Sequence, residues 1–314
     1  MNSVKRIALL LISLLLLPYA VAEEINIFTG LRTGTYFQFG TDIANVANKA
    51  NLHVVVNESE GSVDNVKHLD NSAGIALGIV QSDVLGFLKD SHDSQLKHLA
   101  DRVRLVLPFY HEEVHLFSNK NIKKFEDLQG KRLVVGEKGS GNWLTAVNLL
   151  QMTSVKPAKI LSMSPLKAVT AVLQGDADAM IYVAGKPVPL FTKLGELKKK
   201  PDYAPLFKNV HFVPLDNTIM LRQYDPSDIG PTDYTWLHNK VPTIAVQAVL
   251  MTLDFSGRKN RERCQGLYQL SEVIKNNIGY LKQHGHPKWK EVNLNDSIGT
   301  WKLDRCSHVG VSRN

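Results

Sequence analysis

From residue 25 onward, short runs of apolar residues alternate with longer segments in which apolar positions recur every three or four residues. The short runs predict buried strands, and the longer segments predict amphipathic helices. Strands that alternate with helices are typical of a mostly parallel sheet with helices on both faces. The predicted strands are 25–28, 53–56, 75–80, 103–107, 114–118, 133–135, 160–163, 179–183, 210–213 and 243–253, and the predicted helices are 36–50, 63–69, 84–89, 143–152, 165–174 and 259–283.

The segment 1–22 has a different pattern. Two basic residues precede an apolar run over 7–17, and Pro18 interrupts this run before an Ala-Val-Ala sequence. This pattern predicts a secretory signal peptide with cleavage before Glu23. A membrane anchor is the alternative, but the run is shorter than the roughly 20 apolar residues that cross a bilayer. We therefore expect export to the periplasm.

Composition narrows the class of protein. The chain has 314 residues, of which 44% are apolar and 21% are charged, so we expect about two ordinary domains with a real core. The formal net charge of +7 is mild for this length and favours a small anionic partner. Basic residues are dispersed and do not alternate with aromatic ones, so we expect no nucleic-acid binding.

The chain has only two cysteines, Cys264 and Cys306. In an oxidising compartment two thiols of one chain usually pair. A disulfide would tie the C-terminal tail to the body and contribute about 3–4 kcal/mol on the chain-entropy model. Two buried free thiols are the alternative. A catalytic cysteine is not expected, because no histidine-bearing motif accompanies either residue.

Five loops that follow predicted strands are rich in glycine, hydroxyl and amide residues. In open parallel sheets, ligands bind where the strands end. A glycine lets the backbone approach a ligand, and the free N–H groups of a helix start attract a small anion such as a carboxylate. The candidate ligand-binding residues in these loops are Gly30, Arg32, Thr35, Tyr36, Gly61, Ser62, Gln81, Ser82, Ser140, Gly141, Asn142, Gly185 and Pro187.

Roles can be assigned within this set. We expect the carboxylate end of a ligand to be held by Ser62, Gln81, Ser140 and Asn142. Arg32 or Tyr36 would meet the remainder of the ligand. The alternatives are a plain helix cap for the loop at 139–142 and a packing role for Tyr36. We also expect 81–83 to cap the helix that follows it.

The sequence gives little support to the hypothesis that the protein is an enzyme. There is no Gly-x-Ser-x-Gly elbow and no carboxylate pair placed along a predicted helix. His111 and His115 lie on either side of two glutamates, which would suit a metal ion. However, we expect them on an extended or looping segment and not on one helical face. We therefore expect no catalytic residue, no metal and no cofactor.

Several segments match one known family. They are Thr-Gly at 29–30 with Thr-Gly-Thr-Tyr at 33–36, Glu-Gly-Ser-Val-Asp-Asn at 60–65, Gly-Ile-Val-Gln-Ser-Asp at 78–83, Tyr-His-Glu-Glu-Val-His-Leu at 110–116, Asp-Leu-Gln-Gly-Lys-Arg at 127–132 with Gly-Ser-Gly at 139–141, and 173–179 with 185–187. Together they resemble the TAXI-type solute-binding proteins of tripartite ATP-independent periplasmic (TRAP) transporters. The family's Gly-Ser-x-x-Asn stretch adds Asn65 to the ligand-binding candidates. Asn142, Glu113 and the long C-terminal extension depart from the family pattern.

The resemblance implies an α/β type II periplasmic binding fold with a ligand cleft between two lobes. Lobe 1 would comprise 23–113 plus 247–314, and lobe 2 would comprise 114–246. Two strands would cross between the lobes, near 114–118 and 243–253.

The resemblance also implies a function. The protein would be a monomeric periplasmic receptor that captures a small carboxylate, such as glutamate, a related amino acid or 2-oxoglutarate. It would deliver this solute to TRAP permease subunits in the membrane. The receptor of an ATP-driven (ABC) importer and a periplasmic enzyme on a bilobal scaffold are the alternatives.

Overall fold

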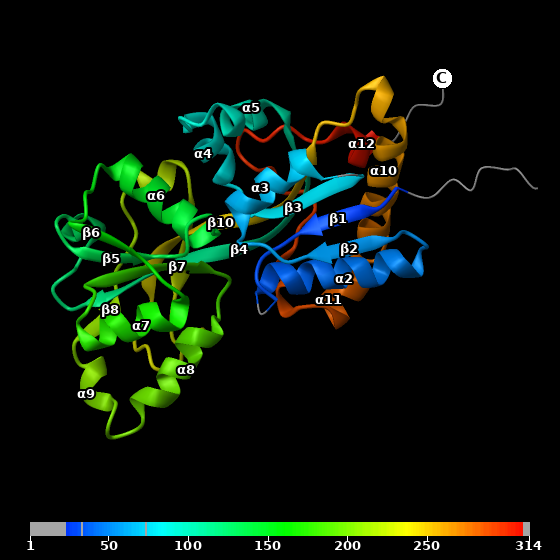
Figure 1. Cartoon of the computed structure of the whole chain (residues 1–314). Helices are drawn as coiled ribbons and strands as arrows, with labels where there is room; N and C mark the ends of the chain where they lie inside the picture. The colour runs from blue at the N-terminus through cyan, green and yellow to red at the C-terminus, as the bar shows by residue number, and fades with distance from the viewer. Residues whose placement is uncertain (1–22, 33, 73, 310–314) are drawn as a thin grey trace, which may run out of the picture.

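The computed structural model describes residues 23–32, 34–72 and 74–309, so the predicted signal peptide at 1–22 lies outside the described residues. The chain forms two α/β lobes that are joined by long strands (Figure 1). The first lobe contains β1 (Ile25–Phe28), α2 (Thr35–Lys49), β2 (Val54–Asn57), α3 (Ser62–Asn71), β3 (Ile75–Gln81), α4 (Val84–Asp90), α5 (Ser94–Arg102), η4 (Arg258–Asn260), α10 (Arg261–Asn276), α11 (Ile278–His284), η5 (Pro287–Glu291) and α12 (Arg305–Val309).

The second lobe repeats the alternation of strands and helices. Its elements are η2 (Phe125–Leu128), β5 (Arg132–Val135), α6 (Gly141–Thr153), β6 (Lys159–Ser162), α7 (Pro165–Gln174), β7 (Ala179–Ala184), α8 (Pro189–Lys198), α9 (Ala204–Phe207), β8 (Val210–Phe212), η3 (Met220–Arg222) and β9 (Asp225–Ile229).

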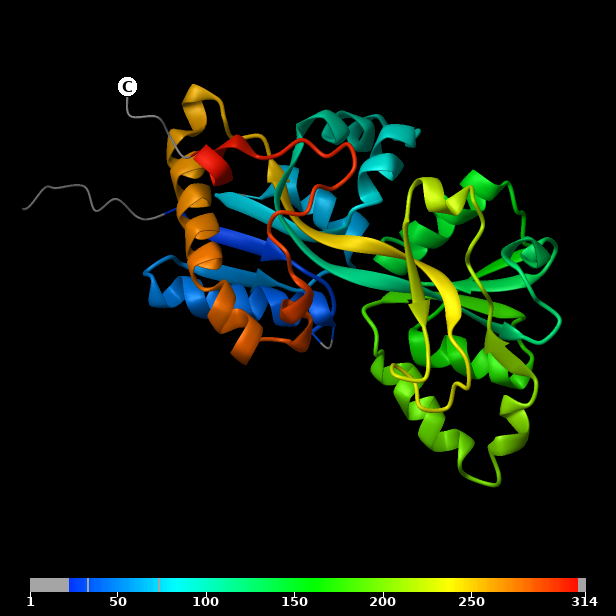
Figure 2. The same ribbon diagram turned by 180° about the vertical axis from the view of Figure 1, so that it is seen from behind.

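Two strands belong to both lobes, β4 (Val103–Asn119) and β10 (Val241–Leu253). They pair antiparallel with each other and run side by side from one lobe into the next (Figure 2). The strand order through the described residues is β2-β1-β3-β10-β4-β7-β5-β6, with β8 on β4 and β9 on β10. Within each lobe the β1 and β5 neighbours are parallel. This is the predicted two-lobed type II fold, and the fold class is confirmed.

Each lobe has its own core. One apolar cluster fills the first lobe and includes Tyr110 from β4 and Ala248 from β10. Two other clusters cover the opposite faces of the second-lobe sheet, and one of them includes Val114 and Val246. The cores therefore change over between 110 and 114 on β4 and between 246 and 248 on β10. Only a few residues of each crossing strand separate the two cores.

The sequence pattern treats 103–107 and 114–118 as separate strands, whereas β4 continues through both. The intervening His111, Glu112 and Glu113 break the apolar run, which makes this part look like a loop. They are tolerated in a strand because it leaves one core and enters the next at this point. The predicted helix at 259–283 is also interrupted, and α10 ends before Asn277.

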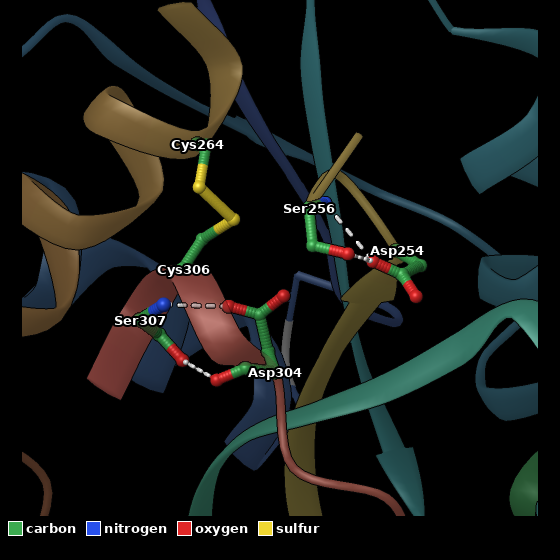
Figure 3. The surroundings of a disulfide bond; sticks show 6 residues. All are labelled: Asp254, Ser256, Cys264, Asp304, Cys306 and Ser307. Atoms are coloured by element: carbon green, nitrogen blue, oxygen red, sulfur yellow. Dashed lines mark hydrogen bonds between the residues drawn. A yellow bond between two sulfur atoms is a disulfide. The ribbon is translucent and has the colours of Figure 1, made fainter. Parts of the chain in front are cut away.

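The C-terminal segment is fastened to the first lobe. Cys264 of α10 and Cys306 of α12 form a disulfide, so the predicted pairing is confirmed (Figure 3). Next to it the Asp304 carboxylate accepts a hydrogen bond from the backbone N–H of Ser307. Across the described ranges, no helix has the length and apolar character that a membrane span requires.

Candidate functional site

A cavity of about 650 Å³ lies between the two lobes. Its walls are the first turn of α2, the loop before α3, β4, the start of α6, the segment after β7, and η5. The volume is within the range of small-molecule sites, about 300–1,000 Å³. Both lobes contribute polar residues, so a molecule bound here would touch both of them.

The start of α6 presents hydrogen-bond donors to this cavity. The Ser140 hydroxyl caps the helix by accepting from the Trp143 N–H, at 3.2 Å. The Asn142 side-chain oxygen accepts from the Val183 N–H, which leaves its amide nitrogen as a donor. In the described part of the chain, the backbone N–H groups of Gly141 and Asn142 have no acceptor. Such free N–H groups at a helix start favour an anion.

Close packing holds this helix start against the first lobe. A Cβ on Gly141 would lie 2.2 Å from Oε1 of Gln81, so a larger residue here would have to displace the Gln81 side chain. Gly61 has φ of +114° and ψ of −152°, a backbone conformation that is essentially restricted to glycine. The Val63 N–H that follows donates to the Gly139 carbonyl oxygen at 3.1 Å. The two lobes are thus directly bonded at one edge of the cavity.

Glu112 is the buried acid of the cavity. Its side chain enters from β4, and the Tyr36 hydroxyl donates to its Oε2 atom at 2.6 Å. Its second oxygen, Oε1, has no hydrogen-bond partner among the described residues. Burial raises the pKa of Glu112 to about 8, against the lowering effects of the Tyr36 hydrogen bond and the Lys288 charge. At neutral pH this carboxyl group is therefore mostly protonated in the structure as it stands.

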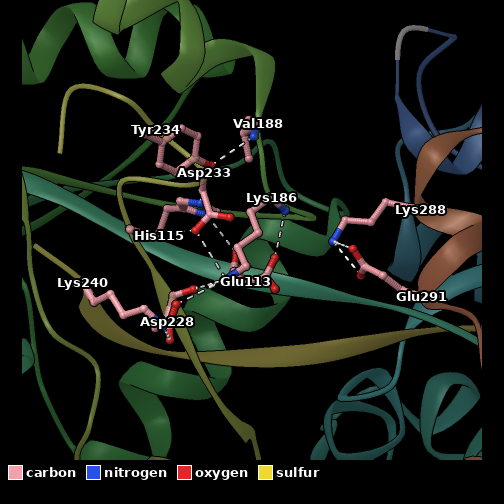
Figure 4. A network of polar contacts seen from close by, with 11 residues as sticks. Glu113, His115, Lys186, Val188, Asp228, Asp233, Tyr234, Lys240, Lys288 and Glu291 are labelled. Carbon is pink, nitrogen blue, oxygen red and sulfur yellow. Dashed lines mark hydrogen bonds and ion pairs between the residues drawn. The ribbon is translucent and has the colours of Figure 1, made fainter.

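Two lysines line the cavity, and both are paired with carboxylates (Figure 4). The Lys186 ammonium lies 3.5 Å from Asp228 and 3.4 Å from Asp233, within the second lobe. The Lys288 ammonium, on η5, contacts Glu291 at 2.7 Å, and its side chain is only 7% exposed. A Cβ on Gly185 would lie 2.4 Å from Cε of Lys288, so this lysine packs against the opposite lobe.

The structure brings most of the sequence candidates to this cavity. Those that line it are Gly30, Thr35, Tyr36, Gly61, Gln81, Ser140, Gly141, Asn142, Gly185 and Pro187.

Four candidates do not line the cavity. Arg32 pairs with Glu58 at 3.0 Å and is 73% exposed, so it does not supply the cation expected there. Ser62 is buried and accepts from the Gln81 N–H. Asn65 donates to two backbone carbonyls inside the first lobe. Ser82 lines a different cavity, of about 820 Å³, which also contains Gln247 of the crossing strand β10 and which we call the hinge-side cavity.

Sequence reasoning missed Glu112 and Lys288 as site residues. Glu112 could have been found, because a charged pair in the middle of an otherwise apolar crossing strand requires a special environment. Lys288 had no such signal: it is one of many lysines, and η5 reaches the cleft only through the packing of the C-terminal segment against α2.

The segment at 111–115 reads His-Glu-Glu-Val-His, which has the letters of a helical zinc motif. It lies in β4, as expected for an extended segment. His111 faces Asp225 at 3.2 Å, whereas His115 is buried against the Tyr234 hydroxyl at 2.8 Å. Burial lowers the pKa of His115 to about 4, so its ring is neutral at pH 7. The described residues contain no group of three side chains that could hold a metal ion.

Several solved structures are similar to this chain in overall arrangement. MatC from Rhodopseudomonas palustris, solved with bound malate, is 12% identical over 81% of this chain and 84% of its own, with a TM-score of 0.48. The periplasmic binding protein BugD is 9% identical over 85% of both chains, with a TM-score of 0.49. The periplasmic aliphatic sulphonate binding protein SsuA from Escherichia coli is 16% identical over 83% of this chain and 76% of its own, with a TM-score of 0.43.

The sequence itself matches a family model over nearly the whole described length. The match covers residues 27–300, which include both lobes, both crossing strands and every residue that lines the cavity between the lobes. The chain therefore belongs to the NMT1-like family.

Proposed function

We propose that the protein is a periplasmic solute receptor that binds a small carboxylate in the cavity between its lobes. One observation carries this proposal: free N–H groups at the start of α6, in the second lobe, meet polar residues of the first lobe around one cavity. A ligand that bonds to both lobes stabilises the closed arrangement by the difference between its contacts in the closed and open states.

The carboxylate of the ligand would be held at the start of α6. The N–H groups of Gly141 and Asn142 and the Asn142 side-chain amide are donors without a partner among residues 23–32, 34–72 and 74–309. The helix dipole adds a partial positive charge at the same place. This assignment keeps Asn142 in the role expected from the sequence, while Ser140 acts mainly by capping the helix.

A second polar group of the cavity, the Glu112 carboxyl, favours a ligand that also carries an ammonium group. Glu112 is a buried residue with one carboxyl oxygen that has no donor among the described residues, and an ammonium placed beside this oxygen would restore the ionised form. A 2-oxo acid has no cation for this position. Of the solutes considered from the sequence, an amino acid such as glutamate therefore fits better than 2-oxoglutarate.

The delivery partner in our proposal is the permease of a TAXI-type TRAP transporter. The support comes from the segments at 60–65 and 78–83, which resemble that family of receptors. Receptors of ABC importers use the same two-lobed fold, so the fold does not separate the two partners. Co-purification of the membrane complex would distinguish an ion-driven permease from one with an attached ATPase.

Calorimetry on unfolded, washed and refolded protein tests the proposed function. We expect L-glutamate or a related amino acid to bind with a Kd below millimolar, and more tightly than 2-oxoglutarate or malate. Failure of every amino acid and dicarboxylate in the panel to bind below millimolar would contradict the proposal. Conversion of a bound compound into a product would favour the enzyme alternative. Mass spectrometry of material that co-purifies with native protein would identify the solute.

A further inference from the structure

Asp83 occupies a helix-capping position but does not cap the helix. It lies two residues after the end of β3 and directly precedes the first residue of α4, where an aspartate normally accepts from the first free N–H groups. Its side chain makes no such hydrogen bond. The cap expected from the sequence is therefore not formed by this carboxylate, which points away from its own helix and toward the other lobe.

Three donors of the second lobe converge on one oxygen of Asp83. Its Oδ2 atom accepts from the Thr145 hydroxyl at 2.9 Å, the Asn148 amide at 3.2 Å and the Tyr224 hydroxyl at 2.8 Å. Thr145 and Asn148 belong to α6, and Tyr224 lies between η3 and β9. All three donors come from the lobe that does not contain Asp83.

The contact is partly buried and separate from the ligand cavity. Thr145 and Tyr224 are buried, and the second carboxyl oxygen of Asp83 is buried without a partner among the described residues. None of the four residues lines the 650 Å³ cavity, and Asp83, Asn148 and Tyr224 line the hinge-side cavity instead. Thr145 also approaches Gln81, which does line the ligand cavity, at 3.4 Å.

We propose that Asp83 is a latch that holds the two lobes together without touching the ligand. A buried carboxylate that loses a donor is left with an unsatisfied charge, which costs more than the loss of a neutral hydrogen bond. Opening the lobes would break all three bonds together. The latch therefore sets the balance between open and closed forms before any solute binds, and through it the solute's residence time.

The distance between the lobes tests the latch directly. Spin labels on Lys67→Cys in α3 and Lys167→Cys in α7, both exposed positions, report the distance across the lobes by pulsed electron resonance. The native disulfide is kept, and no solute is added. We expect a short-distance population in the labelled parent that corresponds to the closed form. Tyr224→Phe, which removes one hydroxyl and keeps the ring, should lower the closed-to-open ratio about fivefold.

A second variant and a control complete the test. Thr145→Val combined with Tyr224→Phe removes two donors and should lower the closed-to-open ratio at least about 20-fold. Tyr280→Phe, at a half-exposed tyrosine on α11, removes a hydroxyl elsewhere and should leave the distances unchanged. Should the double variant fail to fold, Tyr224→Phe alone and Asp83→Asn still test the latch.

Two results would overturn the latch. One is a parent protein that populates only the long distance without solute. The other is a set of distances that Tyr224→Phe and Asp83→Asn leave unaltered. Because no solute is present, neither result depends on whether the proposed receptor function is correct.

Discussion

The two lobes meet on two sides of the first turns of α6. The two contacts differ in how far their polar groups have hydrogen-bond partners in the protein. On the cleft side, N–H groups of Gly141 and Asn142 find no acceptor, and one oxygen of Glu112 finds no donor, among the residues that the structure describes. On the hinge side, one oxygen of Asp83 receives three hydrogen bonds from the opposite lobe. Both contacts place polar groups between the lobes. In the second contact, protein donors satisfy Oδ2 of Asp83, while its Oδ1 atom has no partner among the described residues.

This difference suggests separate roles for the two contacts. The cleft contact selects the solute, and the hinge-side contact stabilises the closed arrangement of the lobes. A buried polar group without a partner costs free energy, and a bound molecule that supplies the partner recovers it. The cleft side therefore gains from a ligand, whereas the three hydrogen bonds to Oδ2 of Asp83 form without one. Substitutions on the cleft side should change which solute binds. Substitutions on the hinge side should change how long any solute stays.

The largest effect is expected where the two lobes touch at Gly61. Gly61→Ala places a side chain in a conformation that only glycine adopts readily, with the Ser140 backbone 3.4 Å from the new Cβ. We expect a cost of about 1–3 kcal/mol, divided between folding and closure, and at least a 10-fold loss of L-glutamate affinity by calorimetry. Gly279→Ala on α11 meets no atom within 4 Å and serves as the control. Wild-type affinity in Gly61→Ala would show that the lobes need not meet at this point.

Glu112 should produce an effect of similar size, and this effect should depend on the solute. Glu112→Gln removes the charge that would face an ammonium, so affinity for L-glutamate should fall about 10- to 100-fold. Affinity for 2-oxoglutarate should stay within about twofold. Glu60→Gln changes another acid of the same cavity and is the matched control. Equal losses for both solutes would place the ammonium elsewhere.

The pH dependence follows from the same carboxyl group. The pKa of Glu112 is raised to about 8, so the free protein carries this proton at neutral pH. Binding of an ammonium requires its release, and L-glutamate affinity should therefore increase with pH, by up to about tenfold per unit below pH 8. Glu112→Gln should remove this dependence. Calorimetry in buffers of different ionisation enthalpy would detect the released proton.

The smallest effect is expected at Arg32, which belongs to neither contact. Its pair with Glu58 is solvent-exposed, and such pairs contribute little to stability. Arg32→Ala should change stability by less than about 1 kcal/mol and L-glutamate affinity by less than about twofold. A large loss of affinity would mean that this arginine swings into the cleft when a solute binds.

Much of the candidate site could be predicted because it depends on local backbone chemistry. Glycines next to hydroxyl or amide residues at 61–62 and 139–142 indicate helix starts at the ends of strands, and several of these residues line the cavity. The roles of individual side chains were less predictable. Ser62 and Asn65 have the right chemistry for a ligand, but burial commits them to backbone groups of their own lobe.

By itself, the sequence determined the alternation of strands and helices, the positions of the glycine-rich helix starts and the presence of two cysteines able to pair. These features depend on neighbours along the chain or on composition. Only the tertiary structure decided that the Asp83 carboxylate accepts from Thr145, Asn148 and Tyr224 instead of capping its own helix. The same holds for the contact between Lys288 and Gly185. The hydrogen bonds of Asp83 join residues that are from 62 positions apart, for Thr145, to 141 positions apart, for Tyr224. Local hydrogen-bonding preference cannot reveal them, because each partner could equally well have been satisfied by its own segment or by water.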